Sequence, residues 1–278
     1  MLTVHPQEIP VPQLHHYLLG AVGPRPIAFA STIDKNGNRN LSPFSFFNVF
    51  SANPPIMVFS PARSGRTGAN KNTFDNVKET REVVINVVNY DMVQQMSLSS
   101  SPYAKEIDEF EKSGLTPIPS ETIQPFRVKE SPVQFECKVN DIVELGQNGG
   151  AGNLVICEVL RIHIDENILD ETGMIDQKKI DLVSRMGGNW YCRANENAMF
   201  EIQKPITTIG IGVDQIPTAI RNSSVLTGND LGLLGSVEAL PTEDEINRFS
   251  KTVNDPHLEA KKLIEKGHIM DAWKVLLS

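Results

Sequence analysis

The residues best suited to binding chemistry are three cations in one loop. Arg63, Arg66 and Lys71 lie within Pro61–Thr73, a segment with no acidic residue and several Gly, Ser and Thr. A predicted helix, Phe74–Arg81, follows directly. A helix start presents free backbone N–H groups, and a guanidinium group offers paired donors, so the segment is suited to a phosphate. A solvated basic surface loop is the alternative. The GxxxxGK[ST] pattern of a nucleotide-triphosphate loop is absent from it.

Composition restricts what this loop binds. The chain has 278 residues and a formal net charge of −8, which argues against general nucleic-acid binding and favours a small anion at the basic loop. No apolar run approaches the ~20 residues of a membrane span, and the first ten residues do not resemble a signal peptide. We therefore expect a cytoplasmic protein with no membrane or nucleic-acid partner.

The cysteines and histidines do not suggest a metal or a nucleophile. Cys137 and Cys157 alternate with apolar residues, as buried strand thiols do, and no CxxC occurs. His15 and His16 have no third ligand at metal spacing. No Ser-His-Asp or Cys-His set stands out, so no catalytic residue and no metal ligand is assigned.

The elements that must position the basic loop are mostly strands. Apolar and alternating runs predict strands over Ile27–Asp34, Asn40–Ser51, Ile56–Ser60, Val83–Val88, Val133–Leu145 and Asn153–Asp165, with further strands around Met199–Ile202 and Ile206–Val213. Besides Phe74–Arg81, helices are predicted in the Tyr90–Leu98 region and over Ala104–Ser113, Glu243–Val253, Pro256–Lys266 and Ile269–Leu277. No regular βαβ alternation appears, so we predict a mainly β protein, an antiparallel barrel with added helices.

The two ends of the chain differ from this barrel pattern. The first twenty residues are Pro-rich and predict an arm, and Arg221–Gly235 is polar and Gly-rich, which predicts a loop. We place a domain boundary at Pro205, giving domains 1–205 and 206–278. The terminal helices have more apolar positions than a small helical unit can bury alone, so we expect them to pack on the barrel or on a partner subunit.

One long segment carries a family resemblance. GPRPIAFASTIDKNGNRNLSPFSFFNVFSANPPIMVFSPAR, followed by KNTFDNVKETREVVINVV, resembles the flavin reductase-like family of FMN-binding split barrels, and the similarity extends roughly from Gly20 to Ile202. The resemblance implies a Greek-key split barrel that normally ends near Pro205, so the predicted C-terminal helical extension lies outside the resemblance. It also implies a homodimer with FMN near the interface, and hydride transfer from NAD(P)H to flavin or a small acceptor.

The resemblance also implies site residues. Those expected to bind FMN are Ser31, Thr32, Pro43, Phe44, Ser45, Phe46, Ser60, Arg63, Lys71 and Thr73, with Arg25 as a possible donor to the flavin ring. Those expected near the substrate are Asn153, Arg185, Gly187, Gly188 and Tyr191. Many members carry Gly-Asp-His where this chain has Gly152-Asn153-Leu154, which leaves the use and choice of nicotinamide open.

Three functions remain open at this stage. The first is an NAD(P)H-dependent flavin oxidoreductase. The second is a non-enzymatic FMN carrier or sensor on the same fold, and the third is a barrel similar to pyridoxamine-phosphate oxidases. The Arg221–Gly235 segment either covers the open face of the flavin or belongs to a structural appendage.

Overall fold

The structure is a computed structural model that describes residues 1–249 and 253–278. The chain divides into two compact units, Met1–Phe200 and Glu201–Ser278. No helix among the described residues has the length and apolar character needed to cross a membrane.

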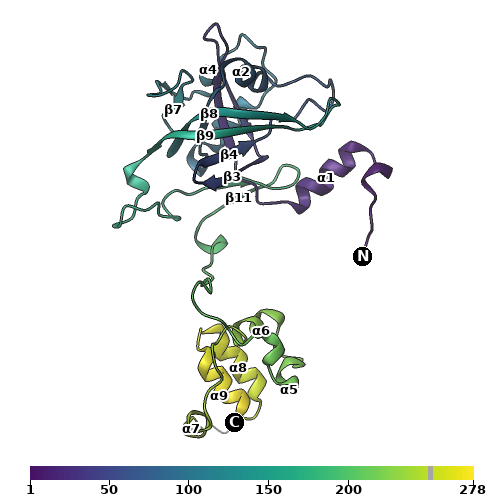
Figure 1. The fold of residues 1–278 in the computed structure, drawn as a ribbon, viewed down its shortest axis with the longest axis vertical. Helices are drawn as coiled ribbons and strands as arrows, with labels where there is room; N and C mark the ends of the chain where they lie inside the picture. The colour runs from purple at the N-terminus through teal and green to yellow at the C-terminus, as the bar shows by residue number, and fades with distance from the viewer. Residues whose placement is uncertain (250–252) are drawn as a thin grey trace. The chain divides into compact units, whose positions relative to one another are not determined.

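The N-terminal unit is built on one antiparallel seven-stranded sheet (Figure 1). Its strands are β1 (Ala28–Ile33), β2 (Arg39–Phe44), β3 (Phe47–Ala52), β4 (Pro55–Phe59), β5 (Glu82–Asn86), β8 (Val133–Glu144) and β9 (Asn153–Ile164). They are ordered β2-β1-β5-β8-β9-β4-β3. The strand predictions around β1, β4, β5, β8 and β9 are therefore confirmed.

The sheet is bent into a split barrel, because its two outer strands are consecutive in the chain. β2 and β3 lie at opposite ends of the strand order, yet only Ser45 and Phe46 separate them. Two residues span only a few ångströms, so the two edges of the sheet must come together. The prediction of one continuous strand over Asn40–Ser51 is wrong, because the chain passes here from one edge to the other.

The core lies on both faces of β1. Ala28 and Ala30 pack with Phe59 and Phe74 in one buried cluster, whereas Phe29 packs in a second cluster beneath the helices. Successive strand residues point to opposite faces, so a strand buried on both faces has no polar alternation. The buried thiols of Cys137 and Cys157 belong to the first cluster, as predicted, and burial raises the pKa of both.

Helices and short elements complete this unit. The helices are α1 (Val11–Ala21), α2 (Asn72–Thr80), α3 (Val93–Ser99) and α4 (Glu109–Ser113), and the short strands are β6 (Pro117–Ile118), β7 (Arg127–Val128), β10 (Val183–Arg185) and β11 (Tyr191–Arg193). Single 3-10 turns occur at Pro6–Glu8, Tyr90–Met92, Glu166–Ile168 and Glu196–Ala198. Three predictions are corrected. The N-terminal arm contains a helix, α4 is only the second half of the predicted helix, and Met199–Ile202 is not a strand.

The C-terminal unit is helical. It contains a 3-10 turn at Val213–Gln215 and the helices α5 (Thr218–Arg221), α6 (Gly228–Leu234), α7 (Glu243–Arg248), α8 (Pro256–Glu265) and α9 (Ile269–Leu277). The last two helices are as predicted, while part of the predicted helix Glu243–Val253 lies outside the described residues. The strand predicted over Ile206–Val213 is wrong, and the predicted loop Arg221–Gly235 contains α6, whose start Thr227 and Asp230 stabilise through a capping box.

This unit buries a core of its own. Trp273 is completely buried, its indole N–H donates to the carbonyl of Leu234 at 2.9 Å, and Ala260, Ile264 and Ala272 pack around it. Of the residues expected to need an outside partner, Ile264 and Trp273 are therefore buried within this unit, whereas Leu258 is 46% exposed. Packing of the remaining apolar surface on the barrel or on a partner subunit stays a prediction. The unit Glu201–Ser278 therefore has a hydrophobic core of its own.

Candidate functional site

The basic loop is fixed between β4 and α2 by backbone contacts. The Arg63 N–H donates to the carbonyl of Ala151 at 2.9 Å, and the Gly150 N–H donates to the carbonyl of Arg63 at 3.1 Å, so the β8–β9 hairpin holds the loop. Lys71 is the N-cap of α2 and has extended backbone angles. The N–H groups of Asn72 and Thr73, in the first turn, have no acceptor within the helix. The loop thus brings an ammonium group and a helix start together.

The cations of this loop are used differently. The Arg63 guanidinium donates to Glu144 at 3.0 Å and to Gln147 at 3.1 Å, and its side chain is only 13% exposed. Hydrogen bonds from Lys78 and Arg63 hold the pKa of Glu144 below its usual range. Lys71 is exposed, and its ammonium group makes no hydrogen bond or ion pair with any described residue. Of these two, Lys71 is the cation free to bind a ligand.

Lys71 faces a hollow of about 460 Å³, which we call the central hollow. Its walls are formed by His15, Leu19, Ser42, Pro43, Phe44, Ser45, Phe46, Ser60, Ala62, Lys71, Ser100 and Arg185. No described residue in this lining is acidic, so the potential inside is positive. The β2–β3 crossing contributes the Pro43–Phe46 wall, and α1 contributes His15, whose ring meets that of Phe46 edge-on at 6.4 Å. The crossing that joins the two edge strands of the sheet therefore also forms one wall of the hollow.

One end of the wall depends on a close approach between β4 and β9. The Ser60 hydroxyl accepts a hydrogen bond from the Asn153 N–H at 3.0 Å, and the Asn153 side chain donates to the carbonyl of Pro61 at 2.9 Å. A Cβ on Gly152 would lie 2.9 Å from the Ser60 oxygen, so only glycine fits. Asn153 is completely buried and does not line the hollow. The structure gives it a place behind the wall, as a support for Ser60.

Arg25 also lies behind the wall. Its guanidinium donates to the carbonyls of Leu19 and Met186, each at 2.8 Å, and to that of Val22. A longer contact of 3.4 Å reaches the Ser45 hydroxyl. Burial, and then the positive charge of Arg185, lower the pKa of Arg25. With its donors taken by carbonyls, Arg25 joins α1 and the β10–β11 hairpin to the crossing.

Three further predicted residues are buried in the strands and in α2. Thr73 donates to Asn40 at 2.6 Å, and Asn40 donates to Glu109 at 3.0 Å, which links α2 to β2 and α4. The Thr32 hydroxyl accepts from Asn76 at 3.1 Å. The Ser31 hydroxyl is buried and has no partner among the described residues. None of the three lines the central hollow.

The β10–β11 hairpin forms the opposite wall. Arg185 and Tyr191 are partners across it, and the Arg185 guanidinium lies 4.6 Å from the centre of the Tyr191 ring. A Cβ on Gly187 would lie 3.1 Å from the Gly20 Cα, so this glycine lets the hairpin approach α1. Gly188 follows with a left-handed φ of 57°. Gly187 therefore shapes the wall without lining the hollow.

A smaller hollow of about 240 Å³, the side hollow, adjoins the central one. Its walls are Ile27, Pro43, Phe44, Ser45, Met96, Ser100, Arg185 and Tyr191. Five of these residues also line the central hollow, namely Pro43, Phe44, Ser45, Ser100 and Arg185. The two hollows therefore share a wall, and Arg185 lies at their junction.

The structure thus gathers part of the predicted set. The predicted residues that line one or both hollows are Pro43, Phe44, Ser45, Phe46, Ser60, Lys71, Arg185 and Tyr191, whereas Arg25, Ser31, Thr32, Arg63, Thr73, Asn153 and Gly187 lie outside the linings. Sequence reasoning missed His15, Leu19, Ser42, Ala62 and Ser100 of the central hollow, and Ile27 and Met96 of the side hollow. A signal for the first two existed, because they are four residues apart in a stretch with Pro12 in its first turn.

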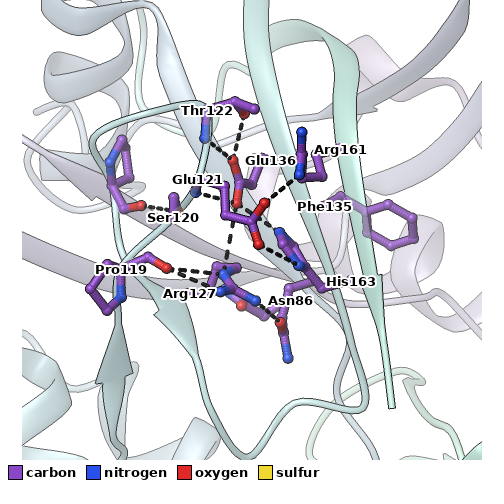
Figure 2. Close-up of polar contacts among 12 residues, drawn as sticks. Asn86, Pro119, Ser120, Glu121, Thr122, Arg127, Phe135, Glu136, Arg161 and His163 are labelled. Atoms are coloured by element: carbon purple, nitrogen blue, oxygen red, sulfur yellow. Dashed lines mark hydrogen bonds and ion pairs between the residues drawn. The ribbon is translucent and has the colours of Figure 1, made fainter. Parts of the chain in front are cut away.

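A second polar cluster lies apart from both hollows, around Glu136 of β8. Figure 2 shows the Glu136 carboxylate accepting from the backbone N–H groups of Glu121 and Thr122, at 2.8 and 2.7 Å, and from the Thr122 hydroxyl. His163 lies at 2.7 Å and Arg127 at 3.7 Å. Burial would raise the pKa of Glu136, but these hydrogen bonds outweigh burial and lower it to about 2. The cluster ties the loop before β7 to β8 and β9.

A hollow of about 630 Å³ adjoins this cluster, but its charges balance. Arg127, Lys129 and Lys179 line it together with Asp91, Glu130 and Asp165. It is larger than the central hollow and has no excess of either sign. Size alone therefore does not make it the better candidate, and we centre the candidate site on the central and side hollows.

Fold and site together define a class, a split β-barrel with a cation-lined hollow at the crossing between β2 and β3. A family model for the flavin reductase-like domain matches residues 21–182. The chain is 36% identical to a protein of Aquifex aeolicus over 181 residues, which is 65% of this chain and 90% of that protein. The chain belongs to the flavin reductase-like family.

Solved structures agree with this assignment. Nitrilotriacetate monooxygenase component B from Bacillus cereus superposes with a TM-score of 0.68 at 31% identity, over 73% of this chain and 98% of that one. A 2-nitrobenzoate 2-nitroreductase from Pseudomonas fluorescens superposes with a TM-score of 0.67 at 26% identity, over 76% and 100%. The recognition of the family and of the split-barrel fold from the sequence is confirmed.

Proposed function

We propose that this protein binds FMN in the central hollow and acts as an NAD(P)H-dependent oxidoreductase with a small-molecule acceptor. The observation that carries the proposal is Lys71, a cation beside the first turn of α2. It is unpaired among the residues that the structure describes, and no acidic residue from that part of the chain lines its hollow. A terminal phosphate is suited to such a place, because helix N–H groups and a cation both favour an anion. The volume of about 460 Å³ lies within the range usual for small-ligand sites.

The remaining lining residues fit an aromatic cofactor. Pro43, Phe44 and Phe46 offer apolar surface to a ring system, and the Ser45 hydroxyl and the backbone of the crossing offer polar contacts at its edge. When bound, the flavin supplies the hydride-transfer chemistry. The protein then has only to bind the phosphate, orient the ring and leave one side open, which explains why no acid–base pair is needed at the hollow.

We propose further that the protein acts as a cytoplasmic homodimer. The three cysteines are free thiols, which suits a reducing compartment. Val49 and Phe50 on β3 are 57% and 68% exposed, and α1 buries no residue. Such apolar surface supports a partner subunit beside the β2–β3 crossing. Light scattering of the purified protein tests this directly, and a monomeric mass at all concentrations would exclude the dimer.

Anaerobic reduction tests the main proposal. Flavin released from the denatured protein should chromatograph as FMN, and NADH or NADPH should bleach the bound flavin in a stopped-flow experiment. Recovery of FAD alone, or no binding of added FMN, would contradict the cofactor assignment. Tight FMN binding without reduction by either nicotinamide would favour the carrier or sensor function. That alternative shares the fold and the site, so only this measurement separates the two.

A further inference from the structure

We propose that the side hollow is the acceptor site and that Arg185 selects acceptors with a carboxylate on a planar apolar body. This inference rests on the proposed function, because it assigns the acceptor of the same site. It goes beyond that function by giving the acceptor a chemical class and by assigning the class to one residue.

The Arg185 guanidinium has no anionic partner among the described residues. The guanidinium makes no hydrogen bond or ion pair with any described residue, although the residue is half-buried. Its described side-chain contact is with the Tyr191 ring, at 4.6 Å. A partly buried charge without a counter-ion is unfavourable unless a ligand supplies one. Arg185 is thus a cation held in position and lacking an anion.

A second arginine on the same hairpin gives the contrast. Arg193, on β11, lies 3.6 Å from the centre of the Tyr90 ring and also forms an ion pair with Asp181 at 2.6 Å. Its hydrogen bonds to Asp181 raise its pKa. Both arginines stack on a tyrosine, but only Arg193 has a carboxylate. The missing element at Arg185 is therefore an acid, which a ligand can provide.

A second positive charge, that of Arg25, lies close to Arg185. Arg25 lies behind the same wall, its guanidinium is bonded to carbonyl groups, and the charge of Arg185 contributes to lowering its pKa. No described residue lining either hollow is acidic. Carbonyl groups satisfy the donors of Arg25 but do not neutralise its charge. A bound carboxylate would therefore interact favourably with both guanidinium groups.

The geometry of Arg185 suits a carboxylate. The Tyr191 ring contacts the guanidinium, and stacking of this kind leaves the N–H groups at the guanidinium edge free. A guanidinium edge binds a carboxylate through two parallel hydrogen bonds, a geometry that an ammonium group lacks. Tyr191 therefore acts as a positioning residue that holds the Arg185 guanidinium at the junction of the two hollows.

The rest of the side hollow suits a planar apolar body. Ile27, Pro43, Phe44 and Met96 supply apolar surface. The Ser100 hydroxyl donates to the Ser97 carbonyl at 2.5 Å, so it can only accept from a ligand. The volume of about 240 Å³ lies below the range of about 300–1,000 Å³ usual for drug-sized ligands, so a single-ring acid fits better than a dinucleotide.

The experiment compares benzoate with benzamide, which has nearly the same shape and no charge, on the FMN-loaded protein. Binding is followed by the change in flavin absorbance and by calorimetry. We expect benzoate to bind roughly tenfold or more tightly than benzamide, because charge-assisted bidentate hydrogen bonds are the strong ones. In Arg185→Gln, benzoate should weaken to the level of benzamide, whose affinity should not change. Equal affinities in the wild type would overturn the inference without any variant.

Arg193→Gln is the matched control, since it removes an arginine that stacks on tyrosine in the same hairpin but lies outside both linings. It should keep the preference for benzoate. Loss of the preference in both variants would mean that the preference depends on the hairpin as a whole and not on the Arg185 guanidinium. That result would overturn the inference. An Arg185→Gln variant that keeps the preference but is reduced more slowly by NADH or NADPH would also overturn it. Arg185 would then bind an anionic group of the nicotinamide cofactor and not the acceptor.

The FMN titration separates the two levels of the proposal. A protein that binds no FMN contradicts the proposed function, and calorimetry of benzoate and benzamide on the flavin-free protein then still tests the side hollow. A protein that binds FMN but does not distinguish benzoate from benzamide contradicts this inference alone. An Arg185→Gln variant that loses FMN and benzoate together places Arg185 at the cofactor and also overturns the acceptor assignment.

Discussion

At the central and side hollows, Lys71 and Arg185 have no acidic partner within residues 1–249 and 253–278, whereas the charges around Glu136 are paired and hydrogen-bonded (Figure 2). Both regions belong to the N-terminal unit and both contain an arginine close to strand ends. The Glu136 cluster links a loop to two strands, and the loss of Glu136 would leave several donors without their acceptor. The charges of Lys71 and Arg185 at the hollows do not link elements of the fold in this way. The difference separates polar groups that stabilise the protein from those kept for a ligand.

The largest effect should follow from Glu136→Ala. It leaves the N–H groups of Glu121 and Thr122 without their acceptor and separates His163 from its partner. Breaking a buried ionic cluster costs about 3–5 kcal/mol, and we expect the free energy of unfolding of the N-terminal unit to fall by that amount. Urea unfolding followed by circular dichroism measures it.

Arg161→Ala is the control for that prediction. Arg161 pairs with Glu121 at the rim of the cluster, where both side chains are about half exposed. Exposed pairs contribute about 0–1 kcal/mol, so this variant should unfold almost like the wild type. Equal losses in the two variants would show that the buried carboxylate has no special role.

Lys71→Ala should act on the ligand and leave stability almost unchanged. We expect FMN binding to weaken about ten- to a hundredfold, since a charge-assisted contact is worth ~1.5–3 kcal/mol, while riboflavin, which has no phosphate, should bind both proteins alike. Arg63→Ala, in the same loop, should weaken FMN binding less, because its guanidinium is paired with Glu144. Fluorescence titration with both flavins measures these affinities. A larger loss of FMN affinity in Arg63→Ala would reverse the roles given to the two cations.

The sequence allowed the strands and the family to be predicted because both depend on local pattern. β1, β5, β8 and β9 have apolar or alternating runs bounded by turn residues, and the segment around Pro43–Phe46 carries the family resemblance. The break between β2 and β3 was not predictable in this way. The apolar pattern continues through Ser45 and Phe46, and only the pairing of the two strands with distant neighbours shows the break.

The roles of individual polar residues depended on contacts far apart in the chain. Composition makes Arg63 and Lys71 look equivalent, but Glu144, which is remote in sequence, pairs with one of them. Asn153 resembled a ligand residue because of its place in the family pattern, yet it is buried against Pro61. The Glu136 cluster had no local signature, since its partners come from a Pro-rich loop and from β9. Tertiary pairing, which no spacing rule encodes, decided each case.

The smallest expected effect is on the pH dependence of stability, and it has opposite signs at two buried glutamates. The folded pKa of Glu136 is lowered to about 2, so its contribution is present above the unfolded value near 4.5 and is lost as the pH falls toward 2. Burial raises the pKa of Glu109, despite hydrogen bonds from Leu41 and Asn40. Its contribution is therefore present below about 4.5 and lost as the pH rises through the folded pKa.

Acid titration of the free energy of unfolding compares the two sites. Between pH 5 and 3, Glu136 should account for a loss of about 1–2 kcal/mol, so Glu136→Gln should lose less stability over this range than the wild type. Glu109→Gln removes a group whose protonation favours the folded state, so this variant should lose more. Both substitutions keep the shape of the side chain, and both sites lie outside the hollows. If both variants lost more stability than the wild type between pH 5 and 3, or both lost less, charge pairing would not distinguish the two carboxylates. Opposite slopes would extend the contrast between paired and unpaired charges to a pair of buried acids within one unit.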